Sequence, residues 1–366
     1  MEGMATFTTV SSSTVIIVAA HRTASAASRL PVNAGFEVMD RTLADRLLID
    51  NPVMFDQTSG GSWLDSVGAR GPVRHMECGA RKDVTEGESL MGSGDQSRVW
   101  LVTGASGGLG QAICRAALDI GDRVVATGRD RESLDSFGAA DDRLLIRSLD
   151  VTDPAASHRV VDDAVAAFGR IDVVVNNAGY GHFGAVEELS DADIRRQFDV
   201  NFFGLATVTR AALPHLRRQG SGVLVQMSSL NGVIGMAGGA YYCASKFAVE
   251  GFSESLAQEV GPLGIQVMLV EPGPHRTHFA SSGARLAEAM PDYAATVGVA
   301  REAFASMDGT QPGDPHRAAD AIVDAVKSGE PPMRLTLGRM AIDAVRDKLE
   351  DQVSGLKSWG MATEFE

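Results

Sequence analysis

A tyrosine and a lysine in the second half of the chain have a spacing that suits proton transfer. In Tyr242-Cys-Ala-Ser-Lys246 the phenol and the ammonium stand four residues apart, so on a helix they share one face. A nearby cation stabilises phenolate and lowers a tyrosine pKa from about 10 toward neutrality. The pair therefore predicts a general acid/base, although taken alone it could also be a surface pair on a helix.

Polar side chains are also expected where two strands end. Ser229 follows the apolar run 222–228, and Asn176-Asn177-Ala178-Gly179 closes the run 171–177. Ligands of open α/β sheets bind outside the carboxyl ends of the strands, where the Ser229 hydroxyl could hold a carbonyl oxygen. Asn201 is expected inside a helix, although asparagine is a mediocre helix former. For Asn201, a role in the site and a buried, backbone-bonded side chain are both open.

Three glycines follow the apolar run 98–103 with the spacing GxxxGxG. Gly104, Gly108 and Gly110 stand between this run and a helix pattern. The missing side chains allow a sharp turn, a close approach to a pyrophosphate and tight helix–strand packing. The helix N-terminus then offers N–H groups to the phosphates. The pattern predicts dinucleotide binding, and the alternative is a tight turn that binds nothing.

The end of the next strand predicts which dinucleotide is bound. An NAD enzyme places a carboxylate about 20 residues after the glycines, where it accepts the ribose 2′-OH. This chain has Gly128 there, followed by Arg129, whose guanidinium suits a 2′-phosphate. We therefore expect NADP(H) rather than NAD(H). The alternative for Arg129 is a solvated loop arginine.

These residues are expected on a doubly wound, Rossmann-type α/β domain with a parallel sheet. Helices should separate the strands, one of them starting at Pro154 after the possible caps Thr152 and Asp153, and another at Ser190. The expected strands are 98–103, 122–127, 143–149, 171–177, 222–228, 264–271 and 333–337.

Five motifs in this order resemble the short-chain dehydrogenase/reductase family across residues 98–338. They are TGASGGLG at 103–110, NNAG at 176–179, Ser229, YCASK at 242–246 and EPGPHRT at 271–277. The resemblance implies a catalytic tetrad of Asn201, Ser229, Tyr242 and Lys246. In it, Ser229 polarises the substrate oxygen and Tyr242 transfers the proton. Lys246 lowers the Tyr242 pKa and holds the nicotinamide ribose, and Asn201 supports a water chain.

The resemblance also implies a set of cofactor-binding residues and a homo-oligomer, either a dimer or a tetramer. Asp150 would contact adenine. The whole set is Thr103, Gly104, Ser106, Gly107, Gly108, Leu109, Gly110, Arg129, Asp150, Val151, Asn177, Ala178, Gly179, Tyr242, Lys246, Pro272, Gly273 and Thr277.

A finer resemblance is to the branch grouped with 17β-hydroxysteroid dehydrogenases, from which steroid chemistry does not follow. It rests on NNAGYGHFG at 176–184, VEPGPHRT at 270–277, QPGDPHRAADAIVDAV at 311–326 and PPMRLTLG at 331–338. His275 departs from the branch, and we expect a solvated loop residue rather than a substrate contact. Residues 278–311, rich in Ala, Met and Phe, are expected to form a substrate lid, which favours a lipophilic substrate. Ordinary helix packing is the alternative for them.

Composition restricts the partners. The formal net charge of −14 argues against nucleic acid and anionic membranes. Three scattered cysteines predict neither a disulfide framework nor a metal site, and no apolar run is long enough for a membrane span. A cytoplasmic protein with a small-molecule substrate is expected.

Two alternatives concern the N-terminal extension and the function. Residues 1–90 precede the domain at 91–366 and are expected to be a flexible or mispredicted extension. The composition of residues 4–35 leaves an organellar transit peptide open, and a small folded appendage is the third possibility. The expected function is a working oxidoreductase. The alternative is a non-catalytic NADP(H)-binding redox sensor or scaffold, which has no need of Tyr242 with Lys246 and Ser229.

Overall fold

The computed structural model describes residues 4–11, 14–21, 97–138 and 141–363, and the chain divides into two compact units, Met1–Glu88 and Ser89–Glu366. In the first unit, β1 (Met4–Ser11) pairs antiparallel with β2 (Thr14–His21). These two strands were not predicted from the sequence. The rest of the N-terminal extension lies outside the described residues, so the interpretations of it stay predictions.

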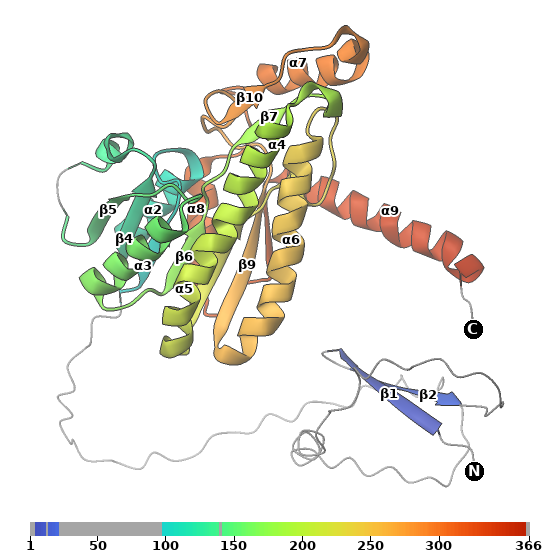
Figure 1. The fold of residues 1–366 in the computed structure, drawn as a ribbon, viewed down its shortest axis with the longest axis horizontal. Coiled ribbons are helices and arrows are strands. Elements are labelled where there is room, and N and C mark those ends of the chain that lie inside the picture. Colours follow the sequence, from blue (N-terminus) through green and yellow to red (C-terminus); the bar gives the residue numbers. More distant parts are fainter. Residues whose placement is uncertain (1–3, 12–13, 22–96, 139–140, 364–366) are drawn as a thin grey trace, which may run out of the picture. The chain divides into compact units, whose positions relative to one another are not determined.

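A seven-stranded parallel sheet forms the centre of the second unit, with the order β11-β9-β8-β6-β3-β4-β5 (Figure 1). All seven strands expected in this region are confirmed. The apolar residues of the inner strands are buried on both faces, as parallel sheets require, and those of the edge strands β5 and β11 are mostly half-buried. The strands are β3 (Val99–Val102), β4 (Arg123–Gly128), β5 (Leu144–Ser148), β6 (Val173–Asn176), β8 (Gly222–Met227), β9 (Ile265–Pro272) and β11 (Arg334–Leu337).

The strand order reverses between β3 and β6. From β3 the chain adds β4 and β5 on one side, then returns to add β6, β8, β9 and β11 on the other. Carboxyl ends of β3 and β6 therefore flank a topological switch point, the place where such sheets bind ligands. The glycine turn follows β3 and the NNAG motif follows β6, so the fold brings both motifs to one crevice.

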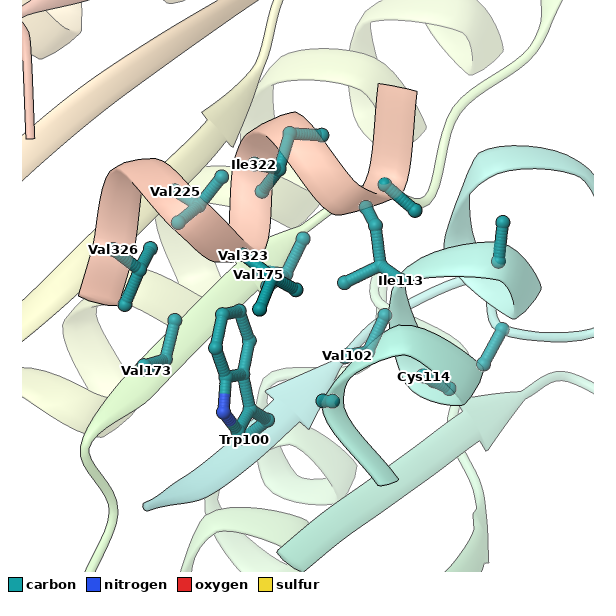
Figure 2. Close-up of a cluster of buried hydrophobic side chains, with 14 of the residues drawn as sticks. Trp100, Val102, Ile113, Cys114, Val173, Val175, Val225, Ile322, Val323 and Val326 are labelled. Atoms are coloured by element: carbon teal, nitrogen blue, oxygen red, sulfur yellow. The ribbon is translucent and has the colours of Figure 1, made fainter. Parts of the chain in front are cut away.

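Helices cover both faces of the sheet. Residues of α2 and α8 pack on one face around Trp100 and Ile113 (Figure 2), and residues of α3, α5 and α6 pack on the other. Asp153 caps α3 and Ser190 caps α4, as expected. The α-helices are α2 (Gly108–Asp119), α3 (Pro154–Phe168), α4 (Asp191–Phe198), α5 (Leu205–Gln219), α6 (Ala240–Val260), α7 (Val299–Ser306), α8 (Pro315–Lys327) and α9 (Arg339–Thr363).

A small second sheet lies beside the main one in this unit. The strand β7 (Gly181–Phe183) pairs in parallel with β10 (Ala284–Leu286), which ties the segment 278–311 to the loop after β6 (Figure 1). Strands of three residues show no periodicity, so the sequence did not predict them.

None of the helices in the described part of the chain is both long enough and apolar enough to cross a membrane.

Candidate active site

The turn after β3 leaves no room for side chains at two of its glycines. Gly104 has a φ of 65°, and a Cβ there would lie 2.9 Å from the Cα of Ala178. A Cβ on Gly110 would overlap the carbonyl oxygen of Gly104 and the amide of Asn177. The expected reasons for these glycines, a sharp turn and tight helix packing, are therefore present in the structure.

Asn177 joins the two strands that flank the switch point. Its Nδ2 donates to the carbonyl oxygens of Thr103 (2.9 Å) and Gly104 (3.0 Å). In return, the Thr103 hydroxyl accepts from the backbone N–H groups of Asn177 and Ala178, each at 3.0 Å. Asn177 was expected to line the cofactor, and its side chain holds the shape of the glycine turn.

The N-terminus of α2 suits an anion. Gly107 stands before the helix with extended backbone, and within the described residues no side chain caps this end. A Cβ on Gly107 would meet no atom within 4 Å, so open space lies beside it. Free N–H groups and the positive end of the helix dipole face this space, which fits a pyrophosphate.

Replacing Gly110 with alanine is expected to lower the melting temperature by several degrees and to weaken NADPH binding at least tenfold. The added Cβ overlaps a backbone oxygen that cannot rotate away, and such overpacking costs about 1–3 kcal/mol. Gly251→Ala is the matched control, because this exposed glycine lies on α6, away from the glycine turn, and a Cβ there would meet no atom within 4 Å. Calorimetry and fluorescence titration measure both effects. Equal behaviour of the two variants would contradict the packing argument.

Exposed charges lie at the end of the crevice where the adenosine is expected. Arg129 and Asp150 follow β4 and β5, two neighbouring strands, and both are exposed. The Asp150 carboxylate accepts from the N–H (2.9 Å) and hydroxyl (2.7 Å) of Thr152. These bonds lower the Asp150 pKa, and the charge of Arg129 lowers it further. The residue after Asp150, Val151, is buried, and its side chain packs against Gly204.

Tyr242 lies on α6 in apolar surroundings. It is 5% exposed, and its ring centroid is 5.2 Å from that of Phe183 and 5.8 Å from that of Phe279. Burial raises the pKa of Tyr242 to about 12, and a hydrogen bond with Ser229 pulls it down. The expected lowering toward neutrality is therefore wrong for this structure, because the buried phenol resists ionisation more than its polar neighbour favours it.

The Lys246 ammonium is also buried. Nζ donates to the carbonyl oxygen of Met227 at 2.8 Å, at the carboxyl end of β8. Burial lowers the pKa of Lys246 to about 8, and the carboxylate of Glu250 raises it. A Cβ on Gly179 would lie 3.6 Å from this Nζ and 3.2 Å from Oδ1 of Asn201. Lys246 and Asn201 therefore converge on the NNAG motif.

Asn201 lies in a π-helical segment, Asp199–Gly204, between α4 and α5. Its Nδ2 donates to the Tyr180 carbonyl (2.9 Å) and to the Ser245 hydroxyl (3.1 Å), and its Oδ1 accepts from the Tyr180 N–H (3.0 Å). The side chain is thus buried and backbone-bonded, which was one of the two alternatives. π-Helical turns occur often at functional sites, and this one turns Asn201 toward Gly179.

The PGPHRT motif packs against the glycine turn and against β11. The side chain of Thr277 packs over Gly108, where a Cβ would lie 3.3 Å from its Cβ. Gly273 donates its N–H to the Leu337 carbonyl at 2.9 Å. His275 was expected to be solvated, and that is wrong. It is half-buried, because its Nδ1 bonds the Gly273 carbonyl at 2.8 Å and its ring packs on Gly313.

Sequence reasoning placed Phe279 and Phe304 in the expected lid but missed Phe183 as a neighbour of the phenol. Phe183 lies 5.0 Å from Phe304 and 6.4 Å from Phe279, ring centroid to centroid, so Phe183 and Phe279 pack on Tyr242 and Phe304 packs on Phe183. The sequence signal was weak, since Phe183 stands in a three-residue strand. Within the described part of the chain, no group of three or more His, Cys, Asp or Glu could hold a metal ion.

Comparisons with known proteins agree with this geometry. A family model described as short chain dehydrogenase matches residues 98–285. Oxidoreductase BOA17 of Botryotinia fuckeliana is 41% identical over 251 residues, covering 68% of this chain and 91% of that protein. Retinol dehydrogenase 8 of Homo sapiens is 36% identical over 255 residues, covering 65% and 80%.

Solved structures are similar as well. A crystal structure of a short-chain dehydrogenase from Streptomyces avermitilis is 44% identical with a TM-score of 0.69, covering 74% of this chain and 98% of that chain. Further structures with this fold contain NADP or NAD.

Proposed function

Because the chain belongs to the short-chain dehydrogenase/reductase family, we propose that it is an NADP(H)-dependent oxidoreductase that interconverts a carbonyl and an alcohol on a small, lipophilic substrate. The observation that carries the proposal is the position of a buried phenol beside the crevice. Ser229 follows β8, and Tyr242 and Lys246 lie on α6. The two elements meet at the carboxyl ends of the strands.

The nicotinamide cofactor, when bound, supplies the hydride for the carbonyl carbon. Ser229 and Tyr242 act on the carbonyl oxygen: Ser229 donates a hydrogen bond to it, and Tyr242 gives it a proton, so the product is the alcohol. With its pKa raised to about 12, the Tyr242 phenol keeps its proton at neutral pH and is ready to donate it. The Lys246 ammonium then stabilises the phenolate that remains.

NADP(H) is the cofactor that the residues favour. The helix N-terminus at Gly107 offers its N–H groups to a pyrophosphate. Gly128 leaves no carboxylate at the end of β4, and the exposed guanidinium of Arg129 stands next to it. A cation suits a 2′-phosphate and has little use for a neutral hydroxyl. A structural neighbour at 28% identity, a serine dehydrogenase, was solved with NADP+.

The aromatic residues around Tyr242 support a lipophilic substrate. Phe183 and Phe279 present apolar rings beside the phenol, and Phe304 packs on Phe183, so a polar substrate would lose hydration there without gaining partners. Two of these rings belong to residues 278–311, the segment that we propose as a substrate lid. The relative named retinol dehydrogenase fits this substrate class.

One buried carboxylate holds this lid in place. Oε2 of Glu188 accepts from Nη2 of Arg301 (2.5 Å) and from the Ala185 N–H (2.6 Å), and Oε1 accepts from the Met290 N–H (2.8 Å). The side chains of Glu188 and Arg301 are 1% and 15% exposed. Arg301 also donates to the Ala287 carbonyl at 2.8 Å. The loop after β7 and the lid therefore share one desolvated ion pair.

Glu188→Gln is expected to raise KM for a lipophilic aldehyde about tenfold while the NADPH Kd stays unchanged. The variant keeps the shape of the side chain but leaves Arg301 buried without a counter-charge, which favours an open lid. A tenfold change corresponds to about 1.4 kcal/mol.

Glu187→Gln is the matched control, because that carboxylate is exposed and contacts the lid only through the Tyr293 hydroxyl. Steady-state kinetics measure KM for the aldehyde in both variants, and only Glu188→Gln should raise it. An unchanged KM in Glu188→Gln would mean that the segment does not cover the substrate.

A substrate panel tests the proposed function. The full chain is incubated with NADPH and a series of aldehydes, ketones and quinones of rising apolarity, and the loss of NADPH absorbance is followed. We expect turnover that rises with apolar character. NADPH binding without turnover on any member would favour the alternative, a non-catalytic redox sensor or scaffold.

We propose further that the enzyme is a homo-oligomer. A stripe of apolar side chains on α9 is exposed, with Ile342 46%, Leu349 50% and Leu356 72% accessible. Their spacing of seven residues is that of a helix–helix seam. Light scattering should report a dimer or larger species that Leu349→Glu shifts toward monomer, and a monomer in the unchanged protein would contradict this.

A further inference from the structure

A group of charged side chains lies behind the catalytic lysine, and the reaction just described does not use it. Glu250 follows Lys246 by one turn of α6, and both side chains are buried. Ser228 stands beside this pair, since a Cβ on Gly232 would meet both the Ser228 hydroxyl and Oε1 of Glu250. The carbonyl that Lys246 bonds belongs to the preceding residue, Met227.

The group continues to the edge of the sheet. Nε of Arg334, on β11, lies 3.2 Å from Oε2 of Glu250 and 3.2 Å from Oε1 of Glu271, on β9. The side chains of Glu250 and Glu271 are 9% and 0% exposed. Glu271 also accepts from the Thr336 hydroxyl at 2.6 Å. Two buried carboxylates therefore share one guanidinium.

Carboxylates outnumber cations in this group. Glu250, Glu271 and the exposed Glu254, whose Oε1 accepts from Nη2 of Arg334 at 2.5 Å, are matched only by Arg334 and protonated Lys246. Loss of the Lys246 proton would leave one carboxylate buried without a counter-charge, which is costly in a low dielectric.

Several groups face Glu250 from the elements packed against it. Lys246 and Glu254 lie on its own helix, Glu271 comes from β9 and Arg334 from β11. Burial raises the pKa of Glu250 and Ser228 lowers it; Glu271 raises this pKa further and Arg334 lowers it. The guanidinium is thus the cation that favours ionised Glu250, together with the Ser228 hydroxyl.

We propose that Glu250 is a positioning residue that keeps Lys246 protonated, and that Arg334 holds Glu250 in its ionised form for this purpose. The inference rests on the proposed catalytic role of Lys246. In the direction of carbonyl reduction the ammonium must be charged, so activity falls as pH rises through its pKa. Glu250 then sets the upper pH limit of the reaction.

The experiment reads the protonation of Lys246 directly. The full chain holds only five lysines, so 13Cε-lysine labelling gives few NMR signals, and Lys246→Met identifies the one of interest. In the unchanged protein this signal should titrate near pH 8, in line with the Lys246 pKa. Glu250→Gln should lower that midpoint by about one pH unit or more, the size expected for a lost charge one helix turn away.

Matched variants separate charge from structure. Glu254→Gln removes an exposed partner of the same arginine and should leave the midpoint unchanged. Glu250→Asp keeps the charge, so its Lys246 midpoint should stay close to that of the unchanged protein. Arg334→Gln favours the neutral form of Glu250, so it should lower the Lys246 midpoint as well. The upper limb of the pH profile of kcat/KM should move with the NMR midpoint.

Two results would overturn the inference. One is a Lys246 midpoint that stays the same in both Glu250→Gln and Arg334→Gln. The other is a shift of equal size in Glu254→Gln. If Lys246 titrates as expected but the protein turns over no member of the substrate panel, the proposed function fails and the link between Glu250 and Lys246 stands.

Discussion

Tyr242→Phe is expected to lower kcat for carbonyl reduction roughly 10²- to 10⁴-fold, the range of general acid–base contributions. The variant keeps the ring that packs on Phe183 and Phe279, and removes only the hydroxyl that gives the proton. NADPH binding should be retained, because the glycine turn and the N-terminus of α2 do not contain this residue. Single-turnover kinetics with NADPH and an active aldehyde measure the loss.

Tyr241→Phe is the matched control for this experiment. It makes the same chemical change one residue earlier, on a half-buried ring whose hydroxyl contacts only the Val186 carbonyl, at 3.4 Å. Its turnover should stay close to that of the unchanged protein. If Tyr242→Phe retained turnover within a factor of three, Tyr242 would not be the proton donor.

Exchanging the charge at the end of β4 is expected to reverse the cofactor preference. The unchanged protein should bind NADPH about 10- to 150-fold more tightly than NADH, since a charge-assisted hydrogen bond contributes about 1.5–3 kcal/mol. In the double variant Gly128→Asp with Arg129→Ala, the carboxylate repels the 2′-phosphate and accepts from the 2′-OH. NADH should then bind more tightly than NADPH.

Packing at Gly128 requires its own control. A Cβ there would lie 3.2 Å from Oγ of Ser133 and 3.4 Å from Cγ of Leu134, so any side chain forces a small shift. Gly128→Ala with Arg129 retained shows that cost without the charge, and it should weaken both cofactors equally. Arg129→Ala alone should weaken NADPH only.

Fluorescence titrations at low and moderate ionic strength complete the cofactor experiment. Salt should weaken NADPH binding more than NADH binding, because only NADPH carries the extra phosphate charge. Equal affinities of the unchanged protein for the two cofactors would show that Arg129 points to solvent and does not read the 2′-phosphate.

The sequence by itself determined the sheet and the positions of its motifs. All seven strands of the main sheet were expected within one or two residues of where they lie, because buried parallel strands are short apolar runs bounded by turns. Gly104 and Gly110 could be recognised from their spacing, since the need for glycine is local to the turn. Likewise Asp153 and Ser190 cap their helices through bonds that span two or three residues.

The tertiary structure decided whatever depends on burial and on partners far away in the chain. A spacing of four residues suggested that Lys246 lowers the Tyr242 pKa, but burial raises that pKa to about 12, and burial is set by Phe183 and Phe279 from other segments. Packing likewise gave Asn177 its bonds to the glycine turn. Glu250 meets Arg334 across 84 positions of sequence, and no local pattern specifies such a contact. Desolvation and long-range pairing follow from how elements pack, whereas strands, turns and caps follow from neighbouring residues.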